Sequence, residues 1–229
     1  MKILGIDTTT KFLSLGLYDG QRIYEYNLDL GTRHSTLLAP TVKRVLDALG
    51  WDIKEIDYFA CGLGPGSFTG IRVGLAAIKG LSLSLNKPVI GISTLDILAS
   101  KVKTPGVLAA PVIDAKRGLI YCSIYKREKG SLKRIAPYML LSQDELCRKI
   151  KRNTVMLGDA LNLYKEKILK NISGIVFLDK DCWYPDGHNI IYLALEKIKG
   201  KTFNNAFNIK PIYLYPKECQ IRKIKTIKR

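Results

Sequence analysis

The chain has 229 residues, 47% hydrophobic and 25% charged, the balance of a soluble globular protein with one domain or two small lobes. No apolar run approaches the roughly 20 residues of a transmembrane helix, and the amino terminus turns polar too early for a signal peptide, so we expect a cytoplasmic protein without a membrane partner. The five cysteines are widely spaced without a Cys-x-x-Cys pair, and indicate neither a disulfide framework nor a zinc site.

The net charge of +17 lies mostly in the second half of the chain. Up to residue 105 there are 12 Lys and Arg against 9 Asp and Glu, whereas from residue 106 onward there are 25 against 11. Clustered cations bind phosphates in a salt-sensitive way, so the second half is a candidate for contact with nucleic acid or another acidic partner. A solvated, lysine-rich surface would explain the same counts.

Hydrophobic periodicity in the first half predicts alternating strands and helices. In chain order we expect strands at 3–7, 13–19 and 22–30, a helix at 35–49, a strand at 58–63, a helix at 69–85, a strand at 89–92 and a short helix at 95–102. Residues 103–106, Lys-Thr-Pro-Gly, indicate a boundary.

The second half follows the same plan. Strands are expected at 108–114, 119–126 and 132–140, then a helix at 143–151, a strand at 155–157, a helix at 161–169, a strand at 175–178 and a helix at 189–198. Both halves therefore read βββαβαβα, which predicts two mixed sheets covered on both faces. By analogy this is the duplicated α/β fold of actin, sugar kinases and Hsp70 (ASKHA, ribonuclease H-like), with lobes at 1–105 and 106–216 and a basic tail at 217–229.

A glycine-rich stretch at 62–74 precedes the second long helix and has the composition of an anion cradle. Glycines let the backbone approach a ligand closely, and the first amides of a helix favour negative charge. A P-loop would need Lys and then Ser or Thr after Gly70, but Ile71 and Arg72 follow. A dinucleotide fold would want an acidic residue after the next strand, which instead ends in Gly-Ile-Ser.

We group this loop with nearby polar residues as a candidate phosphate or nucleotide cleft, made of Asp7, Thr8, Thr9, Gly64, Gly66, Ser67, Thr69, Gly70, Lys116 and Arg117. Asp7 follows the first strand, where actin-like folds often place an aspartate near metal-bound phosphate, although it could equally cap its own turn. Lys116 and Arg117 suit an anion or a solvated hairpin turn. Asp159 is expected to cap the helix at 161 in preference to meeting a ribose.

Histidine and serine patterns predict no catalytic group and no metal site in this chain. His34 and His188 lack the His-x-x-x-His spacing that brings two imidazoles to one ion on a helix. We interpret His34 as an exposed structural residue at a helix start and His188 as a turn residue. Ser35 and Ser67 lie outside any Gly-x-Ser-x-Gly elbow, and a helix cap or a loop position explains each of them better.

Two helices carry apolar stripes that could serve a partner. The stripes comprise Leu38, Val42, Val45 and Leu49 in the first helix and Ile71, Gly74, Leu75, Ala77 and Ile78 in the second. From the residues alone, packing of both stripes on the chain's own sheet is the simpler interpretation.

Several motifs together resemble the TsaB family, also called YeaZ, over most of the chain. They are Ile6-Asp7-Thr8-Thr9-Thr10, Arg33-His34-Ser35, Gly64 to Gly74, Ser93-Thr94-Leu95, Asp114 to Gly118 and Gly158-Asp159-Ala160. Tyr213-Leu214-Tyr215 departs from the Tyr-Leu-Arg often found near the family's end.

The resemblance implies a non-catalytic subunit of the bacterial machinery that places threonylcarbamoyl on the adenosine beside the tRNA anticodon. It implies a heterodimer with the catalytic subunit TsaD through the two helices, assembly with the ATPase TsaE, a homodimer when the chain is alone, and tRNA contact only through the complex. No cofactor would be required, and the cleft would bind ATP or ADP weakly or not at all.

Three other functions stay open at this point. The first is a small-molecule kinase or ATPase that uses Asp7 and the glycine-rich loop. The second is a peptidase, which the missing histidine pair disfavours. The third is direct tRNA binding by the basic second half, which would show a steep salt dependence.

Overall fold

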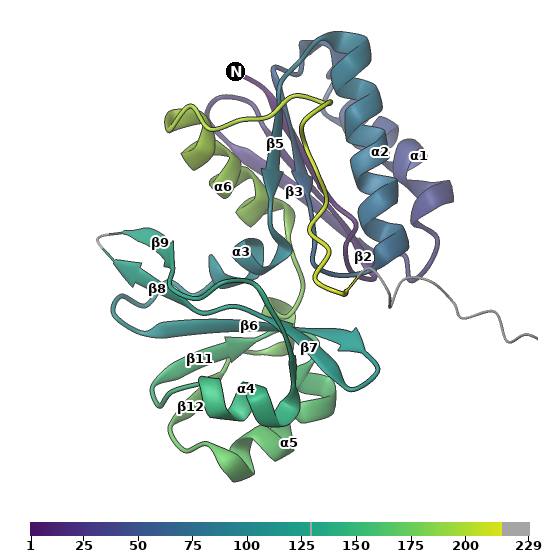
Figure 1. Ribbon diagram of the computed structural model, residues 1–229. Coiled ribbons are helices and arrows are strands. Elements are labelled where there is room, and N and C mark those ends of the chain that lie inside the picture. The colour runs from purple at the N-terminus through teal and green to yellow at the C-terminus, as the bar shows by residue number, and fades with distance from the viewer. Residues whose placement is uncertain (129, 217–229) are drawn as a thin grey trace, which may run out of the picture.

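The computed structural model describes residues 1–128 and 130–216, which form two lobes, each built on a mixed sheet (Figure 1). The predicted two-lobed α/β fold is confirmed, because both sheets have the same strand order and connections. The predicted basic tail at 217–229 lies outside the described residues.

The first sheet has the order β3-β2-β1-β4-β5. Its strands are β1 (Ile3–Asp7), β2 (Phe12–Tyr18), β3 (Ile23–Asp29), β4 (Tyr58–Gly62) and β5 (Val89–Ile92). The first three strands form an antiparallel meander, whereas β4 and β5 continue parallel to β1. All five agree with the predicted strands to within about one residue. Four of them, β1, β2, β4 and β5, are short and almost wholly buried, and only β3 alternates between more and less buried side chains.

The second sheet repeats this order as β10-β7-β6-β11-β12. Its strands are β6 (Leu108–Lys116), β7 (Leu119–Cys122), β8 (Tyr125–Glu128), β9 (Ser131–Arg134), β10 (Met139–Ser142), β11 (Thr154–Leu157) and β12 (Ile175–Phe177). The predicted strands 119–126 and 132–140 are each broken into two. The break has a local cause, since the Ser123 hydroxyl donates to the Ala136 carbonyl at 2.8 Å and Ile124 O accepts from the amides of Ile135 and Ala136.

Two long helices, α1 (His34–Ala48) and α2 (Phe68–Leu85), pack against each other beside the first sheet. A short 3₁₀ turn, η1 (Ile53–Glu55), follows α1. The Ser67 hydroxyl accepts from the Gly70 amide at 3.2 Å and caps α2, which is one of the two roles expected for Ser67. The expectation that Ser35 caps α1 is wrong, because the helix already begins at His34 and no side chain caps it.

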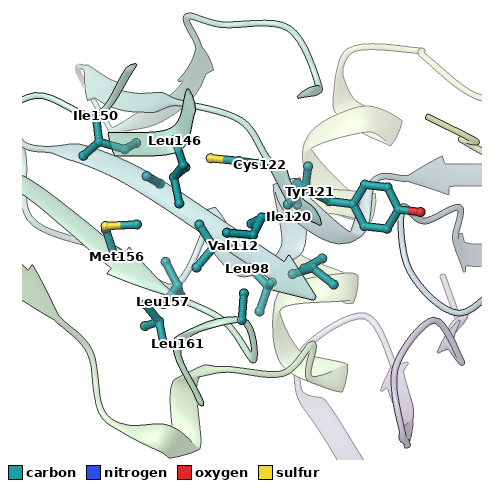
Figure 2. Close-up of a cluster of buried hydrophobic side chains, with 14 of the residues drawn as sticks. Leu98, Val112, Ile120, Tyr121, Cys122, Leu146, Ile150, Met156, Leu157 and Leu161 are labelled. Atoms are coloured by element: carbon teal, nitrogen blue, oxygen red, sulfur yellow. The ribbon is translucent and has the colours of Figure 1, made fainter. Parts of the chain in front are cut away.

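In the second lobe, α4 (Gln143–Lys149) and α5 (Leu161–Asn171) pack against each other, and a 3₁₀ turn, η2 (Lys180–Cys182), follows β12. A capping box between Ser142 and Glu145 starts α4. Figure 2 shows the core of this lobe, where Val112, Leu146 and Leu157 lie among buried apolar side chains.

The last helix of each half packs on the other half. Leu98 of α3 (Thr94–Ala99) belongs to the core of the second lobe and appears there in Figure 2. Ile190 and Ala194 of α6 (Gly187–Lys199) instead pack with Ile90 and other residues of the first sheet.

The segment after α6 returns to the first lobe as well. Asn204 forms an isolated bridge with Val89, and the Ile212 amide donates to the Leu63 carbonyl at 2.8 Å. The prediction that 106–216 forms one lobe is therefore wrong for α6 and for the residues that follow it. The apolar surface of α6 packs on the first sheet, and the sequence pattern of α6 does not indicate which of the two sheets it covers.

By length and composition α2 is the one described helix that could cross a membrane. It contacts β4, β1 and α1, so it is one of the helices that cover the first sheet. Only a third of it is buried, which leaves an apolar side facing outward.

Candidate functional site between the lobes

A cleft of about 920 Å³ opens between the lobes. Among the residues predicted for a phosphate or nucleotide site, the cleft is lined by Thr9, Gly66, Ser67, Lys116 and Arg117. The structure thus brings the glycine-rich loop of the first lobe opposite the β6–β7 turn of the second. The other predicted residues, Asp7, Thr8, Gly64, Thr69 and Gly70, do not line the cleft.

The glycine-rich loop packs against the turn that follows β1. A Cβ at Gly70 would overlap the Thr8 carbonyl oxygen, and a Cβ at Gly66 would overlap that of Thr9. The Ser67 amide donates to Thr9 O at 2.7 Å, and the Thr8 hydroxyl donates to Gly70 O at 2.7 Å. These glycines therefore let the chain's own backbone approach closely, the same property that would serve a ligand.

Asp7 is buried at the end of β1 and caps its own turn. Its Oδ1 accepts from the Thr9 amide and the Thr9 hydroxyl, each at 2.8 Å. Its Oδ2 has no hydrogen-bond partner among the described residues and faces Gly62, where a Cβ would overlap it. Burial raises the pKa of Asp7 to about 6, against the opposing effect of the Thr9 hydrogen bonds. The turn-capping alternative for Asp7 is the one that the structure shows.

The cleft wall contributed by the second lobe contains an ion pair between Lys116 and Asp114. Lys116 donates to Asp114 Oδ2 at 2.6 Å, which raises the pKa of the lysine. Lys116 and Arg117 both have positive φ, +64° and +53°, as the tight β6–β7 turn requires. The cleft therefore presents Lys116 as a lysine already paired with a carboxylate, which weakens its pull on an added anion.

Asp159 lies in the same wall, but the expectation that it caps α5 is wrong. Its Oδ1 accepts from the Asp114 amide at 2.9 Å, and α5 has Ala160 as its N-cap without a side-chain hydrogen bond. Burial raises the pKa of Asp159, because the carboxylate loses water contact behind the cleft surface. Its role in the structure is to hold the end of β6.

Aromatic side chains in the cleft were missed by sequence reasoning. Tyr121, Tyr184, Tyr213 and Tyr215 all line it. The Tyr215 hydroxyl donates to Ala115 O at 2.9 Å, so the end of the described chain closes over the second lobe. Burial raises the pKa of Tyr121 to about 12. Tyr213-Leu214-Tyr215 was visible in sequence only as a departure from a family motif, with nothing to place it at a cleft.

Lys11 is a further cleft cation that the sequence did not single out. It pairs with Asp29 at 2.7 Å and lies 5.2 Å from the centre of the Tyr184 ring. Asp29 lies beside it across the β2–β3 hairpin, whereas Tyr184 comes from the second half of the chain, so the structure is needed to bring the ring to this pair.

The histidines lie elsewhere than expected. His34 is 6% exposed rather than at the surface, and within residues 1–128 and 130–216 its Nε2 has no hydrogen-bond partner. His188 is exposed but is the second residue of α6 rather than part of a turn. No three His, Cys, Asp or Glu side chains in the described part of the chain gather as metal ligands.

The apolar stripes proposed as a partner interface mostly face inward. Six of the nine residues are buried in the chain's own core, namely Leu38, Val42, Ile71, Gly74, Leu75 and Ile78. Val45, Leu49 and Ala77 are half-buried against the same core. That assignment is therefore wrong for the buried six, because a regular apolar stripe marks the side of a helix that faces its sheet.

The duplicated sheets, exchanged helices and interlobe cleft define a two-lobed protein of the actin, sugar kinase and Hsp70 fold class. YeaZ from Pseudomonas aeruginosa has this fold, with a TM-score of 0.80 and 24% sequence identity over 93% of this chain and 100% of that one. A sequence model of the family described as "TsaD: tRNA N6-adenosine threonylcarbamoyltransferase" matches residues 29–173.

Similarity to curated proteins extends over nearly the whole chain. The tRNA threonylcarbamoyladenosine biosynthesis protein TsaB of Buchnera aphidicola subsp. Schizaphis graminum is 32% identical, across 88% of this chain and 97% of the relative. Proteins of the same description from Bacillus subtilis and Escherichia coli are each 29% identical, across 88% and 93% of this chain and 97% and 94% of theirs. The chain belongs to the TsaB family, which confirms the resemblance found in its motifs.

Proposed function

We propose that this chain is an accessory subunit in the biosynthesis of threonylcarbamoyladenosine in tRNA, and that it binds and activates a TsaD-like catalytic subunit. The descriptions of its relatives name this biosynthesis, and the TsaD family model matches its central 145 residues. We place the complex in the cytoplasm and include a TsaE-like ATPase in it. In the absence of TsaD we expect the chain to form a homodimer through the surface that would bind TsaD.

The outward side of α2 is the observation that carries this proposal. Arg72 and Lys79 are the only charged residues among the 18 of the helix, and two thirds of it is not buried. The exposed side carries small or apolar residues, among them Ala76, Gly80 and Leu83. Small residues allow a second helix to approach closely, and an apolar surface of this kind is typical of a protein interface.

The proposal assigns no catalysis to the chain itself. Asp7 is sealed behind Gly62, and Thr8 and Thr9 occupy the space beside the glycine-rich loop. This packing supports a structural role for the motif that an actin-like kinase would use for phosphate. We propose that no cofactor is required and that ATP or ADP binds the cleft weakly at most.

Reconstitution tests this function directly. The purified chain would be mixed with its cognate TsaD and TsaE, tRNA, ATP and threonylcarbamoyl adenylate, and modified adenosine would be counted with each protein left out in turn. We expect formation of modified tRNA to require both TsaD and this chain. Equal modification without the chain would contradict the proposal, and ATP turnover by the chain alone would favour the kinase alternative.

A further inference from the structure

Six exposed cations gather where α4 and α5 end in the second lobe. We call this surface the basic edge, and it consists of Arg148, Lys149, Lys151, Arg152, Lys167 and Lys170.

The topology explains why these residues meet. Helix α4 leads into β11 and α5 leads into β12, and because β11 and β12 are parallel, both helices end at the same edge of the sheet. The Asn153 amide donates to Gly174 O at 2.9 Å, which ties the turn after α4 to the turn after α5. Figure 1 shows the two helices side by side at the end of the lobe.

The positive charge of the basic edge is balanced only in small part by nearby carboxylates. None of its six cations forms an ion pair with any described residue. Between residues 146 and 178 the acids are Asp159, which lies in the cleft, and the exposed Glu166 of α5, so the six cations have one carboxylate close to them in the chain. Basic residues in the last turn of a helix offset the helix dipole, which accounts for Arg148, Lys149 and Lys170. Lys151, Arg152 and Lys167 lie outside those turns and need another explanation.

We propose that the basic edge binds the sugar-phosphate backbone of a folded RNA, which is the tRNA substrate if the proposed function holds. Exposed arginine and lysine side chains bind phosphates without reading bases. A membrane surface fits less well, because Ile150 and Ile168 point into the protein and Leu169 is the one exposed apolar side chain in 148–152 and 167–171.

The basic edge is separate from the cleft and from α2. Thr154 of β11 pairs with Leu108 at the start of β6, whereas the cleft begins at Ile113 and Asp114 near the other end of β6. Six residues of strand span about 20 Å. Substitutions at the edge should therefore leave TsaD binding unchanged, and RNA binding can be tested independently of the complex.

The test is a pair of charge-matched variants of the full chain. One carries Lys151→Gln, Arg152→Gln, Lys167→Gln and Lys170→Gln. The other removes four exposed cations from η1, the end of α6 and the segment that follows it, through Lys54→Gln, Lys199→Gln, Lys201→Gln and Lys210→Gln. Each set includes one lysine from a last helical turn, Lys170 or Lys199. Fluorescence anisotropy with an unmodified tRNA transcript measures affinity across a salt series.

We expect the edge variant to bind tRNA about 10-fold or more weakly, with a salt slope lower by about one for each lost phosphate contact. The matched variant should change affinity less than 2-fold, on the order of a general charge effect. Equal losses in both variants, or none in either, would overturn the proposal, as would binding of phosphatidylserine vesicles with no binding of tRNA. If tRNA is modified equally well without the chain, but the edge variant still binds tRNA more weakly than wild type, the proposed function is wrong and the RNA-binding proposal stands.

Discussion

The Ser100 hydroxyl at the end of α3 lies 2.8 Å from Oδ1 of Asn189 in α6, and both residues are buried. This contact joins the two helices that exchange lobes. Asn189 Nδ2 in turn donates to both carboxylate oxygens of Asp186, and Asp186 pairs with Lys101 at 2.8 Å. A continuous polar network therefore fixes the lobes relative to each other behind the cleft.

Ser100→Ala should destabilise the fold without changing its architecture. It leaves Asn189 Oδ1 buried without its donor, which costs about 1–3 kcal/mol in free energy of unfolding. Urea unfolding of the purified chain measures this loss. Ser84→Ala removes an exposed hydroxyl of α2 and should change the free energy little. Equal effects of the two substitutions would mean that the contact contributes nothing.

Sequence pattern predicted the strands of the first sheet and most helix bounds, because short apolar runs between turn residues and the 3.6-residue period both report burial. It could not predict which sheet a helix covers. Leu95 and Leu98 of α3 form an apolar face, as do Ile190 and Ala194 of α6, and each face fits either lobe by composition. The structure shows that α3 packs on the second lobe and α6 on the first.

Local composition was ambiguous at the candidate site for a similar reason. A glycine that admits a phosphate and a glycine that admits the Thr8 backbone look identical in sequence. The cleft's position between the Ser67 loop and the turn at Lys116 follows from the duplicated fold. Its tyrosines come from segments far apart in the chain, so no single motif identifies them. The Lys11–Asp29 pair spans the β2–β3 hairpin, where Phe12 is the register partner of Asp29, so the predicted hairpin was the signal that could have found it.

Gly70→Ala and Gly80→Ala, both in α2, should change the free energy of unfolding in opposite directions. The methyl group at residue 70 meets the Thr8 carbonyl, so α2 must shift, at a cost of about 1–3 kcal/mol. At residue 80 nothing lies within 4 Å of the added Cβ, and alanine should stabilise the exposed helix by about 0.5–1 kcal/mol. Thermal and urea unfolding measure both. A Gly70→Ala protein of unchanged stability that lost nucleotide binding would instead support a phosphate cradle.

Asp7 should make the protein less stable as the pH rises. Because burial raises its pKa from 3.8 to about 6, the folded chain keeps the proton over a range in which the unfolded chain loses it. The free energy of unfolding therefore falls between pH 3.8 and about 6 and is lower by about 3 kcal/mol above that range. Asp7→Asn removes this dependence, so its stability relative to wild type should rise from pH 4 to 7.

Asp29→Asn is the control for the pH series. A hydrogen bond from Lys11 lowers the pKa of Asp29, so this carboxylate stabilises the fold only above the pH at which it ionises. The stability of Asp29→Asn relative to wild type should fall as the pH rises toward 3.8 and stay level from about pH 4 to 7, where that of Asp7→Asn rises. Parallel curves for Asp7→Asn and wild type would show that Asp7 titrates normally in the folded chain.

Ala76→Arg should separate partner binding from folding. Ala76 is exposed on the outward side of α2, so a long charged side chain there blocks the approach of a second helix without entering the core. We expect the affinity for TsaD to fall about 10-fold or more, as it does when an interface hot spot is changed. The free energy of unfolding should change by less than about 0.5 kcal/mol. Thr104→Arg places the same charge on the exposed linker between the lobes and should leave TsaD binding intact. Titration calorimetry measures both. If a folded Ala76→Arg protein bound TsaD with unchanged affinity, the interface would not include the outward side of α2, because an arginine at the centre of that side would weaken any helix contact made there.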